Sequence, residues 1–276
     1  AYEILSRDWS SDVCSSDAFR SGVFNIGGEG QFLMGGLGAT TFAIVLGGAG
    51  LPAPVVIFGT VLAGAIFGAA WGFIPGFLKV RAGSSEVITT IMLNYIASLF
   101  VFFLLSNWTL IQREDGTQPI SKALADYVVI PGILPIPELR LHLGFLVALA
   151  AAVAVSWFLF RTTRGFELRT AGLNLAAARY AGMGASSSIV AAMAISGALA
   201  GMGGAFEVTG TIKQFSTVVS GGVGFTAIAI ALVGGTRPSG VVAKALVFGA
   251  PRNGGGLLGL VTPIPIDLRF FIPAPL

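Results

Sequence analysis

Hydrogen-bonding side chains interrupt the apolar runs of this sequence at two places. Asn25, Glu29 and Gln31 lie in the glycine-rich stretch FNIGGEGQ at 24–31, and Asn94 lies inside the apolar run 86–108. A carboxylate and three carboxamides supply donors and acceptors but no strong nucleophile, so the chemistry that they offer is reversible binding of a polar solute. Two other interpretations stay open, because Glu29 can lie at a membrane interface and the amide side chains can join neighbouring helices.

Other kinds of chemistry lack the residues that they need. The chain has one cysteine, Cys14, and one histidine, His142, which excludes a disulfide framework or a Cys/His metal site within it. The apolar runs hold no set of His, Cys or paired acids, so we expect neither an enzyme nor a bound cofactor. We expect His142, at the start of an apolar run, to be an interface residue rather than a proton relay.

The overall composition indicates an integral membrane protein. Hydrophobic residues make up 54% of the 276 residues, charged residues only 11%, and the mean hydropathy is +0.85. The net charge of +3 does not indicate a nucleic-acid partner. The basic residues are scattered at the ends of apolar runs, where membrane topology accounts for them.

The apolar runs predict an all-α, polytopic bundle of transmembrane helices. Full-length spans are expected at 31–49, 55–78, 86–108, 143–160 and 189–206, whereas 225–233 and 241–250 are each too short to cross alone. Ser196, Ala200 and Gly204 repeat every four residues, which predicts a close-packed helix face. The glycine-broken stretches 24–31 and 220–235 predict discontinuous helices that line a path for a solute.

Charge predicts how these spans are oriented. The stretch 161–188 carries four arginines against one acid, and the shorter loops 79–86 and 234–240 also carry cations with few acids. Short loops rich in Lys and Arg stay in the cytoplasm, so we expect these three loops inside, the loop 112–141 outside, and the first span starting inside at Gln31.

Within the stretch 161–188, the sequence predicts one short helix. Asn174 is a suitable N-cap for a helix that begins at Leu175, and Gly182 follows where a helix commonly ends in a left-handed residue. A helix of two turns is too short to be stable alone in water. It must therefore pack against its own membrane domain or dock onto a cytoplasmic partner.

Both ends of the chain look atypical. The run DWSSDVCSSD at 8–17 looks like the translation of a sequencing adapter, so we expect residues 1–20 to be an artefact of sequencing or assembly, or else a disordered leader. Residues 21–276 are then expected to form one transmembrane domain. The proline-rich stretch after Pro263 predicts that the last part is truncated or altered.

Four motifs carry a family resemblance. NIGGEGQFLMGG, EVITTIMLNYIA, RTTRGFELRTAGLNLAAARYAGM and GFTAIAIALVGGTRPSG, in this order, closely resemble the permease subunits of bacterial ABC importers for simple sugars and nucleosides, which are similar to the branched-chain amino acid permeases. The resemblance covers about residues 21–260. The first two motifs most resemble the nucleoside branch, although Gly28 stands where that family more often has Ala.

This resemblance implies a fold, a location and a set of partners. The fold would be that of a type II ABC importer permease, in the bacterial plasma (inner) membrane. A second permease subunit, two cytoplasmic ATPase subunits and an extracytoplasmic substrate-binding protein, such as a lipoprotein, would complete the importer. ATP hydrolysis would belong to the ATPase partner, because this chain has no G-x-x-x-x-G-K-[ST] phosphate loop.

The resemblance also assigns roles to residues. It implies that the stretch 161–188 is the coupling segment, in which Arg169, Gly172, Asn174, Ala177 and Gly182 contact the ATPase. From their polar groups and the helix breaks, we expect Asn25, Glu29, Gln31 and Asn94 to lie along the substrate pathway. The alternative is an ion-coupled secondary transporter of a small polar solute. That mechanism needs buried ionisable groups, and the sequence offers only Glu29 and Glu207.

Overall fold

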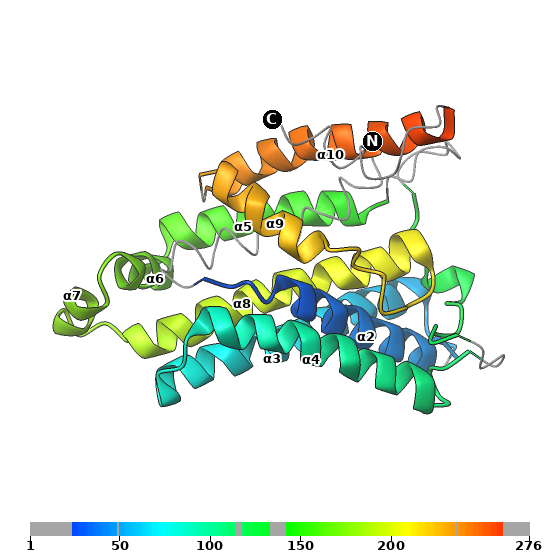
Figure 1. Cartoon of the computed structure of the whole chain (residues 1–276), viewed down its shortest axis with the longest axis horizontal. Coiled ribbons are helices and arrows are strands. Elements are labelled where there is room, and N and C mark those ends of the chain that lie inside the picture. Colours follow the sequence, from blue (N-terminus) through cyan, green and yellow to red (C-terminus); the bar gives the residue numbers. More distant parts are fainter. Residues whose placement is uncertain (1–23, 49, 114–117, 133–141, 236, 262–276) are drawn as a thin grey trace.

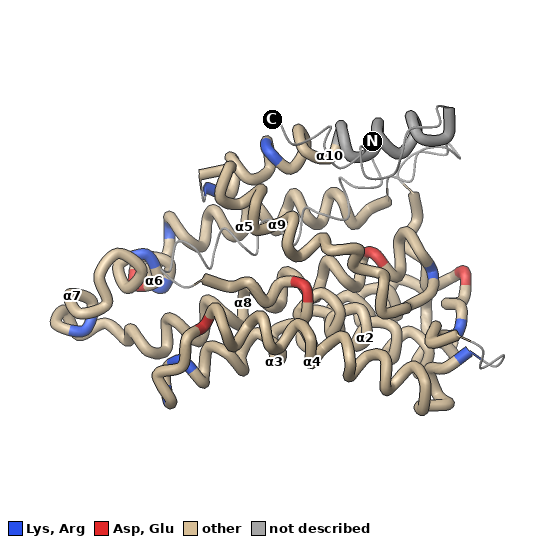
Figure 2. Tube along the Cα trace, viewed as in Figure 1, with Lys and Arg blue, Asp and Glu red and all other residues tan. Residues whose placement is uncertain are grey.

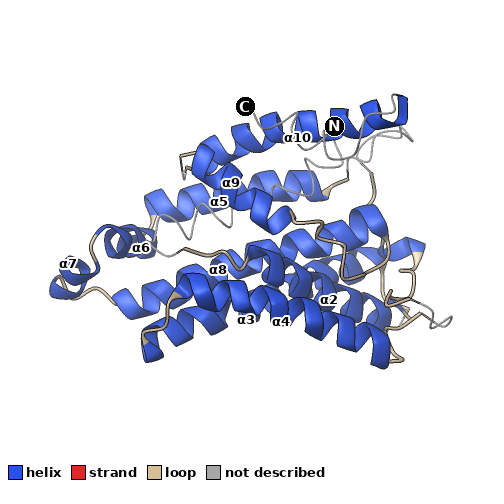
Figure 3. Cartoon of the chain, in the orientation of Figure 1, coloured by secondary structure: helices blue, strands red, loops and turns tan. Residues whose placement is uncertain are grey.

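A computed structural model describes residues 24–48, 50–113, 118–132, 142–235 and 237–261. The long elements in these ranges are helices, joined by loops and turns (Figure 3). The expectations for residues 1–20 and for the stretch after Pro263 lie outside the described residues. The helices are α2 (Gly28–Gly47), α3 (Ala53–Ala82), α4 (Glu86–Asn107), α5 (Gly144–Arg161), α6 (Thr163–Leu173), α7 (Leu175–Tyr180), α8 (Ala185–Phe206), α9 (Val223–Val233) and α10 (Pro238–Val261), with a 3-10 turn η1 (Asp126–Val128) and a π-helical turn η2 (Glu207–Ile212).

Long apolar helices lie side by side along the length of the molecule (Figure 1). Five of them in the described part of the chain are long and apolar enough to cross a membrane: α2, α3, α4, α5, and α8 together with η2. Helices α2, α3 and α8 pack most tightly, α4 lies against α2, and α5 packs with α10. The structure therefore confirms the predicted all-α, polytopic bundle.

Glycine faces allow the central helices to touch backbone to backbone. Gly64, Gly68 and Gly72 repeat every four residues along α3 and face Gly197 and Gly201 on α8; a Cβ on Gly68 would overlap the Gly197 carbonyl group. Small residues allow such close approach, and van der Waals contact then stabilises the helix pair. The sequence analysis did not predict this face of Gly197 and Gly201. The predicted face, formed by Ser196, Ala200 and Gly204, packs against other parts of the bundle.

The predicted face of α8 turns toward α2 and α5. Gly204 lies against the backbone of Phe32 in α2, and Ser196 bonds to the segment before α2. Ala200, fully buried, belongs to an apolar cluster with Val155 and Leu159 of α5. Helix α8 is thus close-packed on two faces, which explains its run of small residues.

The extents of two helices, and the existence of a third, differ from the sequence-based predictions. Helix α3 does not end near Leu78 but continues through the buried Pro75 to Ala82; membrane helices tolerate proline where neighbours and local adjustment satisfy the freed carbonyl. Helix α10 spans 24 residues rather than only 241–250. Helix α6 was missed, because its sequence is polar and its apolar pattern is weak.

The depth in the bundle at which α2 begins differs from the prediction that the first span starts inside at Gln31. Gly30 bonds to Asn94, eight residues into α4, and Asn25 bonds to Ser196, eleven residues into α8. At 1.5 Å per residue, these contacts lie about 12 Å and about 16 Å from the starts of α4 and α8. Gln31 is therefore near the middle of the bundle and not at its inner end, so α2 is one of the predicted discontinuous helices.

Most of the described charged residues lie toward the two ends of the bundle (Figure 2). We call the end that holds 79–86, 161–184, 234–235 and 237–240 the basic end. The end that holds 107–113, 118–132, 142–144 and 207–216 is the opposite end. The charged residues in the ranges of the basic end are Lys79, Arg81, Arg161, Arg164, Arg169, Arg179 and Arg237, with the acids Glu86 and Glu167. This excess of cations is the pattern of a cytoplasmic face.

Candidate functional site

The residues just before α2 are held by a buried amide pair. The Asn25 side chain donates to Gln31 Oε1 at 3.0 Å and accepts from Gln31 Nε2 at 3.1 Å. Its amide also donates to Ser196 Oγ at 2.8 Å, and its oxygen accepts from the Gly27 backbone at 2.9 Å. Asn25 and Gln31 are each 1% exposed. Their polar groups therefore bind one another and position the break in the chain.

Asn94 satisfies the backbone at the same break. Its oxygen accepts a hydrogen bond from the Gly30 N–H at 2.8 Å, and its amide donates to the Ile26 carbonyl at 2.8 Å. The first turn of a helix leaves N–H groups without intrahelical partners, and in a membrane interior each such group is costly. A side chain with both a donor and an acceptor supplies what α2 needs to begin inside the bundle.

Glu29 joins the two predicted discontinuous segments. Its carboxylate accepts a hydrogen bond from the Ser220 hydroxyl and another from the Gly224 backbone N–H, the latter at 2.9 Å. Gly224 lies in the first turn of α9, an 11-residue helix too short to cross a membrane alone. The glycine is required there, because a Cβ on Gly224 would overlap the Glu29 backbone.

The starts of α2 and α9 therefore meet at one carboxylate. Helix N-termini carry partial positive charge and bind anions, and discontinuous helices in transporters place such ends at the solute site. Here Glu29, which is partly buried, supplies the anion from the chain itself. The structure brings together Asn25, Glu29, Gln31 and Asn94 in positions that hold the two breaks; whether they also contact a solute stays a prediction.

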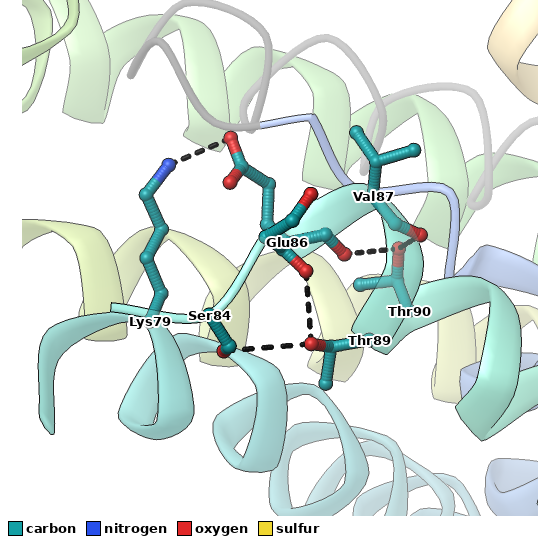
Figure 4. Close-up of polar contacts among 7 residues, drawn as sticks. Lys79, Ser84, Glu86, Val87, Thr89 and Thr90 are labelled. Atoms are coloured by element: carbon teal, nitrogen blue, oxygen red, sulfur yellow. Dashed lines mark hydrogen bonds and ion pairs between the residues drawn. The ribbon is translucent and has the colours of Figure 1, made fainter. Parts of the chain in front are cut away.

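A second cluster of polar residues lies at the connection between α3 and α4 (Figure 4). Lys79 forms an ion pair with Glu86 at 2.6 Å, across the turn between the two helices. The hydroxyls of Thr89 and Thr90 bond to backbone carbonyls one turn earlier in α4, at 2.9 Å and 2.7 Å. Both hydroxyls therefore bond to the backbone at the start of their own helix.

The predicted short helix in the basic stretch is α7. Asn174 Oδ1 accepts from the Ala177 N–H at 3.0 Å, which is the expected N-cap bond. Gly182 has φ of 73°, and its N–H and that of Met183 bond back to Arg179 and Ala178 carbonyls at 3.0 Å. This is the left-handed termination that the glycine predicted.

Helix α7 has one packed face and one free face. Ala171, Ala178 and Ala185 are buried together, with Leu175 and Met183 against them. On the free side, Tyr180 at the end of α7 is 97% exposed, and Leu173, the last residue of α6, is 89% exposed. Sequence reasoning missed these two residues, although a large apolar group beside a capped helix in a polar stretch is a recognisable signal.

The predicted ATPase contacts differ in their exposure. Ala177, Asn174 and Gly182 are exposed and Gly172 is half-buried. Arg169 instead turns its guanidinium onto the Phe160 ring of α5, 4.9 Å from its centroid. Arg169 therefore anchors α6 to the bundle in this structure, and the outward surface belongs to α7 and the end of α6.

The structure has several helices of membrane-spanning length, and the starts of two helices meet inside the bundle. This arrangement indicates a membrane transport protein. The chain matches the family described as branched-chain amino acid transport system, permease component, over residues 18–272. It belongs to this family and is the permease subunit of an ABC importer, a multi-pass protein of the plasma membrane in bacteria.

Relatives of known name agree with this assignment. The chain is 40% identical to the guanosine ABC transporter permease protein of Bacillus subtilis, covering 94% of this chain and 73% of that protein. It is 37% identical to a nucleoside ABC transporter permease protein of Lactococcus lactis, covering 92% and 73%, and 34% identical to a glucose ABC transporter permease protein of Haloferax volcanii, covering 92% and 68%. No solved structure matches the chain significantly.

Proposed function

We propose that this permease subunit imports nucleosides. A cytoplasmic ATPase that binds α7 and the end of α6 would drive the transport. The supporting observation is the exposure of Leu173 and Tyr180 beside the capped helix, at the end where cations gather. Large apolar groups held out in water on a fixed helix are typical of an interaction surface. A second permease subunit and an extracytoplasmic binding protein complete the proposed importer.

A neutral solute fits the electrostatics of the mid-bundle site. The ends of α2 and α9 would attract an anionic solute, but Glu29 already occupies them through Ser220 and Gly224. A second carboxylate or a phosphate brought there would meet a like charge. Nucleosides and sugars are neutral, in contrast to the carboxylate-bearing amino acids in the family's description. The relatives named for guanosine and nucleosides favour the nucleoside.

Docking is tested with paired variants of the complete importer in proteoliposomes. Tyr180→Ser and Leu173→Asp are expected to abolish recruitment of the ATPase and solute uptake, because both remove exposed apolar area without disturbing the bundle. Tyr180→Phe keeps the ring and is the matched control, with uptake within about twofold of the native chain. Uptake by Tyr180→Ser at the native rate would contradict the docking role.

Gly172→Glu provides an independent test in α6. A bulky charge at this half-buried position is expected to stop solute-stimulated ATP hydrolysis and uptake while the protein remains in the membrane. Retained uptake, with normal amounts of the variant in the membrane, would argue against α6 and α7 as the coupling segment.

The energy source and the solute are tested separately. Uptake of radiolabelled guanosine is expected to persist with a protonophore and to stop when ATP is depleted; the reverse would favour the ion-coupled alternative. Excess unlabelled uridine is expected to compete with guanosine, and excess glucose is not. Competition by glucose alone would move the assignment from nucleosides to sugars.

A further inference from the structure

A groove between α5 and α10 has no role in the function proposed so far. Its volume is about 450 Å³, and its walls include Leu149, Val153, Trp157 and Arg161 of α5 and Ser239 of α10. The two helices pack against each other and lie side by side at one edge of the bundle (Figure 1). The groove is mainly apolar, and its charged residue, Arg161, belongs to the basic end.

The apolar part of the groove has the depth of one lipid leaflet. Val153 is 64% exposed and Trp157 is 62% exposed. Side chains this exposed on a membrane-crossing helix contact lipid or another protein, because water is excluded there. From Leu149 to Arg161 the helix rises about 18 Å, at 1.5 Å per residue. The hydrocarbon core of a bilayer is about 30 Å thick, so one leaflet accounts for about 15 Å of it.

Positive charge at one end of the groove is not neutralised by the chain. Arg161, the last residue of α5, is exposed, and no ion pair joins it to an acid in the described part of the chain. Glu167, the next acid along the sequence, is paired with Arg164 at 3.3 Å. A second cation lies close by, because the Arg169 guanidinium stacks on the ring of Phe160, which also lines the groove. This end of the groove therefore favours an anion.

The order of the side chains along α5 follows the layers of a bilayer. Leu149 and Val153 lie deepest, Trp157 follows one turn later, and Arg161 one turn after that. Tryptophan is enriched at membrane interfaces, at the level of the head groups. Basic pockets between membrane helices bind the head groups of anionic lipids. The exposed Ser239, on the other wall, offers a hydroxyl as a further hydrogen-bond donor.

We propose that this groove holds one anionic glycerophospholipid from the leaflet that meets the basic end. Its phosphate group binds at Arg161 and Ser239, and one acyl chain lies along Val153 and Leu149. A lipid fits better than a protein segment, because the charge is confined to one end and the apolar part is one leaflet deep. The site depends on neither the solute nor the ATPase, so it can fail while the proposed import function stands.

The emission of Trp157 tests the site directly. The assembled importer, native or with Trp157→Phe, is placed in vesicles that contain increasing fractions of phosphatidylglycerol or phosphatidylcholine with brominated acyl chains. The difference in emission between the two proteins reports Trp157. Brominated phosphatidylglycerol is expected to quench it at about fivefold lower mole fraction, which corresponds to about 1 kcal/mol, the attraction of one arginine to an anionic leaflet.

Two outcomes would overturn the proposal. Equal quenching by both lipids would show that the groove holds only ordinary boundary lipid, without selection for charge. Quenching by neither lipid would show that another protein surface, such as a second permease subunit, covers the groove.

A pair of charge variants shows whether the selection comes from this groove. Arg161→Gln removes the cation from an exposed position, and it is expected to abolish the fivefold preference for phosphatidylglycerol. Arg81→Gln is the matched control, because it removes a cation from the same end of the bundle but from α3, where the guanidinium lies over the Phe77 ring. This control should keep the preference. Loss of the preference in both variants, or in neither, would contradict the site.

Discussion

The carboxylate of Glu29 accepts a hydrogen bond from the hydroxyl of Ser220, 191 residues further along the chain. Through this contact and the neighbouring bond from the Gly224 N–H, the starts of α2 and α9 share one negative charge. The pair connects the two segments whose irregular backbone lies inside the bundle. Any movement that separates α9 from α2 must break this contact.

Replacing the charge of Glu29 should weaken this connection. Glu29→Gln keeps an acceptor for one donor but loses the charge that strengthens both bonds. Uptake in proteoliposomes is expected to fall about tenfold, which corresponds to about 1.4 kcal/mol. Glu29→Leu removes both acceptors and should lower thermal stability as well. Ser220→Ala keeps the bond to Gly224 and should have the smallest effect; a larger effect than Glu29→Leu would refute this order.

Asn94→Leu should destabilise the start of α2. It leaves the Gly30 N–H and the Ile26 carbonyl without partners inside the bundle, at a cost of about 1–3 kcal/mol for each group. Thermal unfolding of the purified protein in detergent measures the loss. Asn107→Leu is the matched control on the same helix, because Asn107 is exposed and bonds only to its own helix. Equal melting temperatures for the two variants would contradict the capping role of Asn94.

The glycine contact between α3 and α8 should not tolerate a side chain. Gly68→Val would drive methyl groups into the backbone of Gly197 and Gly201, so the helices must separate. We expect a loss of more than about 3 kcal/mol, seen as low yield of folded protein or a much lower melting temperature. Gly48→Ala is the control, since nothing lies within 4 Å of its added Cβ and its φ is negative. If both variants lost a comparable amount of stability, the loss would come from replacing any glycine and not from the contact between α3 and α8.

His142 should make stability depend on pH. Burial lowers the pKa of His142 to about 4, from 6.5. The unfolded state binds the proton more readily, so stability is full above pH 6.5 and falls as pH drops toward 4, by about 3 kcal/mol at most. His142 is the only histidine, so the difference between the native chain and His142→Gln isolates its share. A constant difference in melting temperature from pH 7.5 to 4.5 would show that the ring is not buried.

The sequence was sufficient for features that depend on neighbouring residues. Hydropathy over about 20 residues located the spans α4 and α5 within one or two residues. Asn174 and Gly182 located α7, because a cap bond and a left-handed end involve only residues within one turn. The same local reasoning failed for α6, whose pattern is polar, and for Pro75, whose surroundings in the bundle decide whether the helix continues.

From its own amino acids, the sequence determined that this chain crosses a membrane repeatedly and carries a capped helix between two spans, because solvation and capping are local. Only the tertiary structure decided that α2 begins near mid-bundle, that Asn25 and Gln31 bind one another, and that Glu29 meets Ser220. Those contacts join residues brought together by the close approach of glycine-faced helices, and no local pattern specifies which distant partner will satisfy a buried polar group.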